Sequence, residues 1–167
     1  MRAVPSGFTF LLAVAVLGAA PALAAAQRTI DVSVAAGPAF SRTTDDVGGY
    51  AQLSAGRAIP RSVLYLRGEA SYASRVGAER SDVFALGGAA QLVPRVTRHP
   101  WRPYLIAGAG AYRHSEGPDE GFHFGVNGGA GVWLSAGDVQ LVLETRYHVV
   151  NGIAESRYLP LVIGIRF

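Results

Sequence analysis

Charged side chains recur at every second position in two stretches of this sequence. Glu144, Arg146 and His148 follow one another in this way, and so do Arg67 and Glu69. Residues two apart lie on the same face of a β-strand, so each stretch would present a row of ionisable groups on one face. Such rows could line an ion-conducting pore. They could instead pair with one another as a hydrogen-bonded polar core, because buried ions need partners.

The same alternation extends along the rest of the chain and predicts β-strands. No unbroken apolar run is long enough for a transmembrane helix, although 50% of the residues are hydrophobic. Hydrophobicity spread through short alternating stretches is typical of membrane β-barrels. The expected strands are Thr29–Phe40, Tyr50–Ile59, Val63–Ser74, Val83–Val93, Pro103–His114, Phe122–Ser135, Val139–Val150 and Tyr158–Phe167.

Eight is an even number of strands, which closes an antiparallel barrel with both chain ends on one side. The sequence therefore predicts an all-β fold, an eight-stranded antiparallel transmembrane barrel with up-and-down meander topology. The interior of such a barrel is only wide enough for side chains to fill it, which favours the paired polar core over the pore. The predicted lumenal polar network consists of Asp31, Arg67, Glu69, Asn127, Glu144, Arg146, His148 and Arg166.

The connections between the predicted strands differ in charge. With the chain ends in the periplasm, the extracellular connections carry most of the acidic residues, and Ser115–Gly121 is the acidic loop among them. The periplasmic connections carry mainly arginine, and Gly137-Asp138 marks a tight hairpin. Aromatic residues sort into two bands, which we interpret as interfacial girdles. The outer band is Phe40, Tyr50, Tyr72, Phe84, Tyr112, Phe122 and Tyr158, and the inner band is Trp101, Tyr104, Trp133 and Phe167.

The closing segment Tyr158–Phe167 is apolar at every second position and ends on an aromatic residue. An unpaired hydrophobic strand at the end of a chain invites aggregation, so this strand is expected to pair with an earlier one. The segment resembles the C-terminal insertion signal of bacterial outer-membrane β-barrel proteins. The residues that carry this predicted signal are Tyr158, Leu161, Ile163, Ile165 and Phe167.

Residues 1–26 have the pattern of a secretory signal peptide. Arg2 gives a positive start, an apolar core follows, and the alanines at 22–26 provide the small residues of a cleavage site. Residues 27–167 then form a single barrel domain. The absence of cysteine excludes disulfides and thiolate metal sites. The net charge of +3 is small and dispersed, which argues against nucleic acid as a partner.

Three stretches carry a resemblance to a known family: P-Y-L-I-A-G-A-G-A-Y (103–112), F-G-V-N-G-G-A-G-V-W-L (124–134) with L-V-L-E-T-R-Y (141–147), and the closing Y-L-P-L-V-I-G-I-R-F. Together they resemble the outer membrane protein β-barrel domain family, which includes small OmpA-, OmpX- and Ail-like barrels. The resemblance implies location in the outer membrane and a structural or surface-interaction role, without catalysis or cofactor. The expected partners are outer-membrane lipid, lipopolysaccharide and the barrel-assembly machinery; no particular extracellular partner is identified.

A second resemblance concerns His148. The segment E-T-R-Y-H-V-V-N-G (144–152) is similar to a segment of lipid A 3-O-deacylases, which are also eight-stranded outer-membrane barrels. In those enzymes a histidine and a serine two residues later act as base and nucleophile. Val150 stands at the position of the serine here and has no oxygen with which to attack an ester. We therefore expect His148 to belong to the polar network, with lipid A modification as the alternative.

Two further alternatives remain from the sequence. His114 and His123 flank the acidic loop and could meet across a hairpin around a metal ion, although their spacing matches no metal motif, so no metal site is predicted. The acidic loops could also bind divalent cations, but ordinary solvated loop charge is the simpler interpretation. A soluble exported barrel with a ligand cavity, like a lipocalin, would require the apolar faces to point inward.

Overall fold

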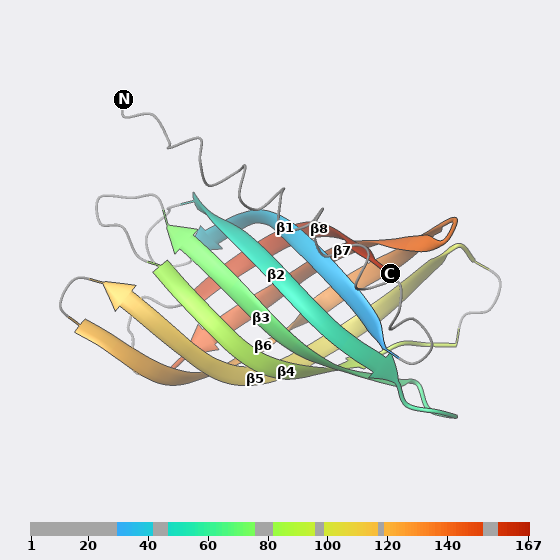
Figure 1. Ribbon diagram of the computed structural model, residues 1–167, viewed down its shortest axis with the longest axis horizontal. Helices are drawn as coiled ribbons and strands as arrows, with labels where there is room; N and C mark the ends of the chain where they lie inside the picture. The colour runs from blue at the N-terminus through green and yellow to red at the C-terminus, as the bar shows by residue number, and fades with distance from the viewer. Residues whose placement is uncertain (1–29, 42–46, 76–81, 96–98, 117–118, 152–156) are drawn as a thin grey trace.

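The chain forms a closed barrel of antiparallel strands in the computed structural model, which describes residues 30–41, 47–75, 82–95, 99–116, 119–151 and 157–167 (Figure 1). The predicted signal peptide, residues 1–26, lies outside these ranges. The strands are β1 Asp31–Ser41, β2 Val47–Ala58, β3 Leu64–Arg75, β4 Asp82–Leu92, β5 Trp101–Glu116, β6 Asp119–Ala136, β7 Val139–Val150 and β8 Arg157–Arg166.

Each strand pairs antiparallel with its neighbours in the sequence, and β8 pairs with β1 to close the ring. The predicted eight-stranded up-and-down fold is confirmed. The described residues contain no helix long and apolar enough to cross a membrane. The predicted hairpin at Gly137-Asp138 is also confirmed, with Gly137 at φ 66°, a conformation that glycine adopts without steric cost.

The prediction of a loop over Ser115–Gly121 is wrong for most of that segment. β5 and β6 continue through it, with Ser115 opposite Glu120 and Glu116 opposite Asp119. These two strands form the longest hairpin of the barrel and extend beyond the neighbouring strand ends (Figure 1). Acidic side chains made the segment look like a solvated loop, but backbone pairing in a hairpin does not require apolar side chains.

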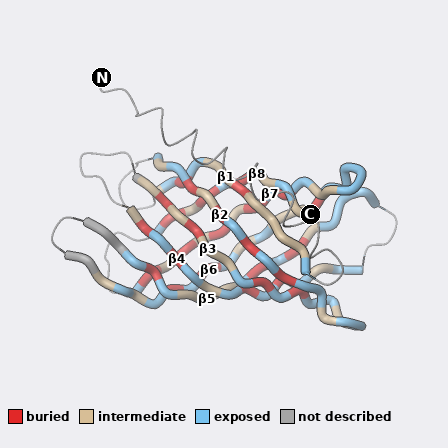
Figure 2. Tube along the Cα trace, in the orientation of Figure 1, coloured by how far each residue is buried: buried red, intermediate tan, exposed pale blue. Residues whose placement is uncertain are grey.

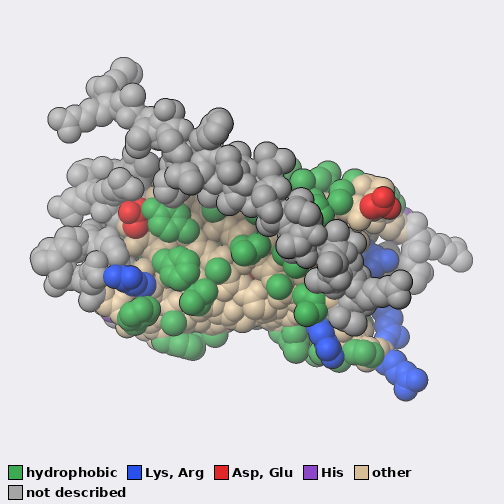
Figure 3. All heavy atoms as spheres, viewed as in Figure 1, with side chains coloured by type: hydrophobic (Ala, Val, Ile, Leu, Met, Phe, Trp, Pro, Cys, Tyr) green, Lys and Arg blue, Asp and Glu red, His purple; other side chains and the backbone are tan. Residues whose placement is uncertain are grey.

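Buried and exposed residues alternate along the strands, as the red and pale-blue bands of Figure 2 show. The exposed positions are large and apolar, including Leu105 at 61%, Ile163 at 65% and Phe122 at 78%. Hydrophobic side chains cover much of the wall in the view of Figure 3. The charged positions of β3 and β7 point inward instead. This distribution is the reverse of the one that a lipocalin-like barrel requires.

The prediction of two aromatic girdles is wrong in part. Phe40, Phe84, Phe122 and Trp101 are exposed on the outer wall. The aromatic residues that point into the barrel instead are Tyr50, Tyr104, Tyr112, Trp133 and Tyr158, each with at most 5% of its surface exposed. The space inside the wall must be filled to native density, and bulky rings fill it where the wall is built from small residues.

Interior tyrosine rings lie over glycines of a neighbouring strand. A Cβ added to Gly125 would lie 2.6 Å from the Tyr112 ring, and one added to Gly131 would collide with the ring of Tyr104. Gly125 and Gly131 of β6 thus have a specific use. They make room for the tyrosines of β5.

Candidate functional site

A closed ring of ion pairs lies at the centre of the barrel. Arg67 contacts Glu69 at 3.1 Å and Glu144 at 2.8 Å. Arg146 contacts the same two carboxylates, Glu69 at 2.7 Å and Glu144 at 2.9 Å. All four side chains are at most 8% exposed. We call these four residues the central quartet; two positive and two negative charges balance within it.

The central quartet spans the barrel from wall to wall. Arg67 and Glu69 come from β3, while Glu144 and Arg146 come from β7, four strands away in a ring of eight. Alternation on both strands directs these charges inward, so the ion pairs form across the lumen. Because these ion pairs join opposite walls, the four side chains fill the middle of the barrel.

Neutral polar groups complete the hydrogen bonding of the central quartet. Arg146 donates to the side-chain oxygens of Gln52 at 2.5 Å and Asn127 at 3.0 Å. The Tyr104 hydroxyl donates to Glu144 at 2.6 Å. Desolvated charges are tolerated when they have both ion partners and hydrogen bonds, and each carboxylate here has at least two donors. A cavity of about 10 Å³ beside Glu69 and Asn127 has room for one water molecule.

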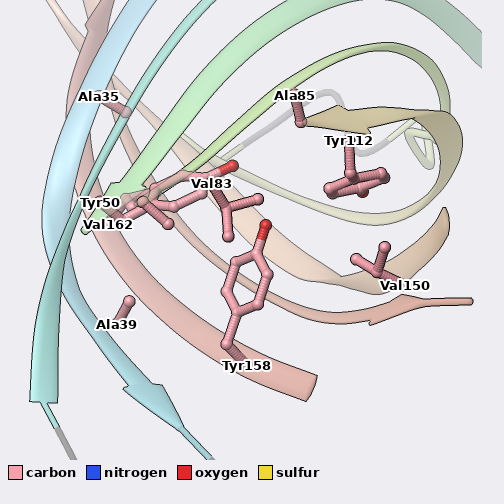
Figure 4. Close-up of a cluster of buried hydrophobic side chains, with 10 residues drawn as sticks. Ala35, Ala39, Tyr50, Val83, Ala85, Tyr112, Val150, Tyr158 and Val162 are labelled. Atoms are coloured by element: carbon pink, nitrogen blue, oxygen red, sulfur yellow. The ribbon is translucent and has the colours of Figure 1, made fainter. Parts of the chain in front are cut away.

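An aromatic cluster lies beside the central quartet and surrounds His148. The imidazole stacks on the Tyr158 ring, with a centroid distance of 4.5 Å and an interplanar angle of 12°. Its Nδ1 is 3.1 Å from the Tyr112 hydroxyl, which also accepts a hydrogen bond from Asn127. Figure 4 shows Tyr50, Tyr112 and Tyr158 directed into the barrel around this region. Asn127 therefore connects the aromatic cluster with the central quartet through Arg146.

Within the described residues, the ring contacts and hydrogen bond of His148 are with aromatic rings and a tyrosine hydroxyl rather than a serine. His148 is 1% exposed, and Val150 lies in a buried cluster with Tyr112 and Tyr158. The neighbouring hydroxyl belongs to Tyr112 and is already engaged with Asn127. A general base must reach both a nucleophile and a substrate, and the burial of His148 is unfavourable for that role.

A third polar group lies at the end of the barrel that carries the short turns. Arg166 contacts Asp31 at 2.5 Å and donates to Gln140 at 2.6 Å. Its guanidinium carbon also lies 4.0 Å from the Trp133 ring centroid and 4.8 Å from that of Tyr65. We call these five residues the turn-end group. Their charges are less buried than those of the central quartet, at 14% for Arg166 and 41% for Asp31.

The predicted lumenal residues thus separate into two sets. Arg67, Glu69, Glu144, Arg146, Asn127 and His148 are joined by hydrogen bonds, whereas Asp31 and Arg166 form a pair of their own near the turns. Sequence reasoning missed six members of the polar groups: Gln52, Tyr65, Tyr104, Tyr112, Trp133 and Gln140. For Gln140, the alternation along β7 was a sufficient signal. In the middle of β5, both faces carry only apolar or small residues, so alternation could not assign its tyrosines to a face.

Gln91 is buried without a hydrogen-bond partner for either side-chain amide atom within the described part of the chain. It is 0% exposed and lies on β4 opposite Tyr65 and Ile106. A buried amide that lacks partners costs free energy, so this residue weakens the interior at the turn end.

Two features of the sequence remain: the histidines considered as metal ligands, and the closing strand. The described residues contain no group of three His, Asp or Glu side chains placed to hold a metal ion. The side chains of His114, Glu116 and Asp119 lie outside the part of the chain that can be described, and His123 is half-buried. At the closing strand, Leu161, Ile163 and Ile165 face outward and Tyr158 faces inward. Their action as an insertion signal, together with Phe167, stays a prediction.

No protein-family model and no curated protein matches the sequence. Solved structures do match, and they are small outer-membrane barrels. Neisserial surface protein A is 23% identical with a TM-score of 0.66, over 82% of this chain and 94% of that one. The N-terminal β-barrel domain of Pseudomonas aeruginosa OprF is 16% identical with a TM-score of 0.53, over 82% and 97% of the two chains.

The outer membrane enzyme PagL also matches, at 16% identity and a TM-score of 0.55, over 82% of this chain and 98% of that one. These likenesses concern the fold. The chain has the fold of the small eight-stranded outer-membrane barrels, which agrees with the family resemblance found in its sequence.

Proposed function

We propose that this protein is an integral outer-membrane barrel with a filled polar interior and a structural or surface-interaction role. The observation that carries the proposal is the distribution of side chains between the two faces of the wall. Exposed leucines, isoleucines and phenylalanines cover the outside, while the ion pairs of the central quartet lie inside. Such a surface is stable where lipid covers the wall and every backbone polar group is paired within the barrel.

The location in the outer membrane is also supported by two solved structures that share this fold and are named as a surface protein and an outer membrane enzyme. Export would use the predicted signal peptide, and the barrel-assembly machinery would read the closing strand. Lipopolysaccharide and other outer-membrane lipids would be the partners of the wall. An extracellular partner would meet the end that carries the β5–β6 hairpin.

Electrophoretic mobility of the refolded chain tests the membrane barrel. Residues 27–167, refolded in detergent, should migrate differently with and without boiling, because a barrel with all backbone bonds closed resists cold SDS. Identical mobility, together with solubility in the absence of detergent, would refute the proposal and favour a soluble barrel. A chain carrying Leu105→Asp and Ile163→Asp is a useful control, since it should fail to insert into lipid vesicles.

Planar-bilayer recordings test whether the interior is filled. The central quartet links β3 with β7 across the lumen, so the folded protein should produce no steady ion conductance. The double variant Glu144→Ala, Arg146→Ala removes one charge of each sign and empties the centre, and it should conduct measurably. Regular channel openings from the unaltered protein would contradict the filled interior.

The second candidate function is lipid A modification. It is favoured by the resemblance of residues 144–152 to a segment of lipid A 3-O-deacylases, and the fold is shared with one outer membrane enzyme, PagL. The buried position of His148 beside Val150 argues against it. Mass spectra of lipid A decide between the two. Expression of this protein should leave the lipid A masses unchanged, whereas loss of an acyl chain that depends on His148 would establish the enzyme.

A further inference from the structure

A cavity of about 330 Å³ opens at the turn end of the barrel. Its walls come from the β2–β3 turn, the segment after β4 and the first residues of β5, and Trp133 and Arg166 line it from the interior. The volume is near the lower limit for pockets that bind small organic molecules. We call it the turn-end cavity; the end of the barrel at which it opens lies on the right in the view of Figure 1.

The lining of the turn-end cavity is positively charged. Among the described residues it includes Arg95, Arg102 and Arg166 and no carboxylate. Arg166 is balanced by Asp31, but neither Arg95 nor Arg102 has an ion-pair partner within the described residues. Both are exposed at the rim, so their charges are available to a ligand.

A second cavity beside it shows that this charge is not general to the turn end. The neighbouring cavity, of about 220 Å³, shares Arg166 and Gln140 with the first but also contains Asp31 and Asp138. The hydrogen-bonded Arg166 and Gln140 therefore stand between a cationic cavity and one with acidic groups. An anionic ligand should therefore prefer the first cavity, because the second presents carboxylates that would repel it.

Much of the remaining lining is apolar, with Ser62 and Gln140 as polar exceptions. Val63, Leu64, Val93 and Pro94 contribute side walls, and the Trp133 ring forms part of the inner surface. Arg166 already packs over that ring and holds it in place. A ligand that carries a carboxylate or phosphate beside an apolar or aromatic body could use both features, with its anionic group at Arg95 and Arg102 and its body against the wall.

We propose that the turn-end cavity is a binding site for a small organic anion of this kind. The inference goes beyond the structural role proposed above and requires only the folded barrel. It assigns a function to the periplasmic end, where the sequence had indicated nothing except an excess of arginine.

Fluorine NMR tests the proposal with 4-fluorobenzoate as the probe and the refolded barrel in a non-ionic detergent. Line broadening of 4-fluorobenzoate should saturate with concentration, whereas neutral 4-fluorobenzyl alcohol should show only the broadening caused by the micelles. The double variant Arg95→Gln, Arg102→Gln should weaken binding by about fivefold or more, because two charge-assisted contacts are lost. Heat-dependent mobility of each variant establishes that it has folded.

The matched control is Arg57→Gln, Arg61→Gln, which removes two exposed arginines at the same end that do not line the cavity. It should leave binding unchanged. Equal weakening by the two double variants would overturn the site in favour of diffuse attraction to a basic surface. Equal broadening by the acid and the alcohol, or displacement by inorganic phosphate at the concentrations at which 4-fluorobenzoate binds, would overturn the organic-anion assignment. A failure of the membrane proposal would appear separately, in the mobility and conductance experiments.

Discussion

The central quartet and the turn-end group use the same chemistry at two depths. Both pair arginine with carboxylate beside aromatic rings, but the side chains of the central quartet are at most 8% exposed, whereas Asp31 at the turn end is 41% exposed. Attraction between charges grows as water is excluded, and so does the cost of leaving one of them unpaired. The extent to which an ion pair is buried therefore determines how much stability the protein loses when one partner is removed.

The largest expected effect comes from Arg146→Met, which keeps the side-chain volume but removes a guanidinium bonded to Glu69 and Glu144. Two buried carboxylates would then share Arg67 alone. Urea unfolding in lipid vesicles should show a loss of about 3–5 kcal/mol of stability. Addition of Glu144→Gln should recover part of this loss, since Arg67 and Glu69 then remain as a balanced pair. A loss below about 1 kcal/mol would mean that depth does not distinguish the two groups.

A smaller effect is expected from Tyr104→Phe, which removes the hydroxyl that donates to Glu144 at 2.6 Å. The carboxylate keeps its two arginines, so only one charge-assisted hydrogen bond is lost, and the cost should be about 1–3 kcal/mol. The same unfolding assay measures it. If Tyr104→Phe cost as much as Arg146→Met, the hydroxyl rather than the ion pairs would be the main support of Glu144.

The turn-end pair should be much less sensitive. Asp31→Asn removes a carboxylate that is 41% exposed to solvent, and the stability should fall by less than about 1 kcal/mol. Salt should reduce even this difference, because exposed charges are screened. Measurement at low and high salt, with Glu69→Gln as the buried counterpart, sharpens the comparison. A salt-independent loss above about 2 kcal/mol would contradict it.

The smallest effect, and the one of opposite sign, is expected from Gln91→Met. The amide has no partner within the described residues, so replacing it with an apolar side chain of similar length removes a desolvation penalty without breaking a hydrogen bond. The barrel should gain up to about 1 kcal/mol. A clear loss of stability would show that Gln91 has a partner, such as an ordered water molecule, which its replacement displaces.

The sequence was most informative on strands that carry charge on one face. On β7, Glu144, Arg146 and His148 mark the inner face, and the bounds predicted for that strand agree with the structure. A one-residue shift of such a strand would place its charges against lipid, so the phase is strongly specified. The eight-stranded count and the outward face of β8 followed from the alternation of apolar residues.

The sequence was least informative on β5. Leu105 and Ile106 are adjacent and apolar, so alternation could not assign Tyr104 and Tyr112 to a face, and their spacing suggested interfacial girdles. The contact of each tyrosine with a glycine of β6 depends on the register between two strands, which is a tertiary property. The same limit applies to the central quartet. Its charged residues were visible in the sequence, but the ion pairs that join side chains of β3 to side chains of β7 across the lumen were not.

The proline of the closing strand affects the register in which β8 pairs with β7. Pro160 has no N–H to offer β7, and its carbonyl accepts a hydrogen bond from the outward-facing Thr145 hydroxyl at 2.9 Å. A slip of β8 by two residues would keep every side chain on its correct face, so the hydrophobic pattern alone could not prevent it. Such a slip would place the residue without an N–H opposite another carbonyl and bring the carbonyl of a different residue to the Thr145 hydroxyl. Pro160 therefore favours one alignment of β8 over its two-residue slips.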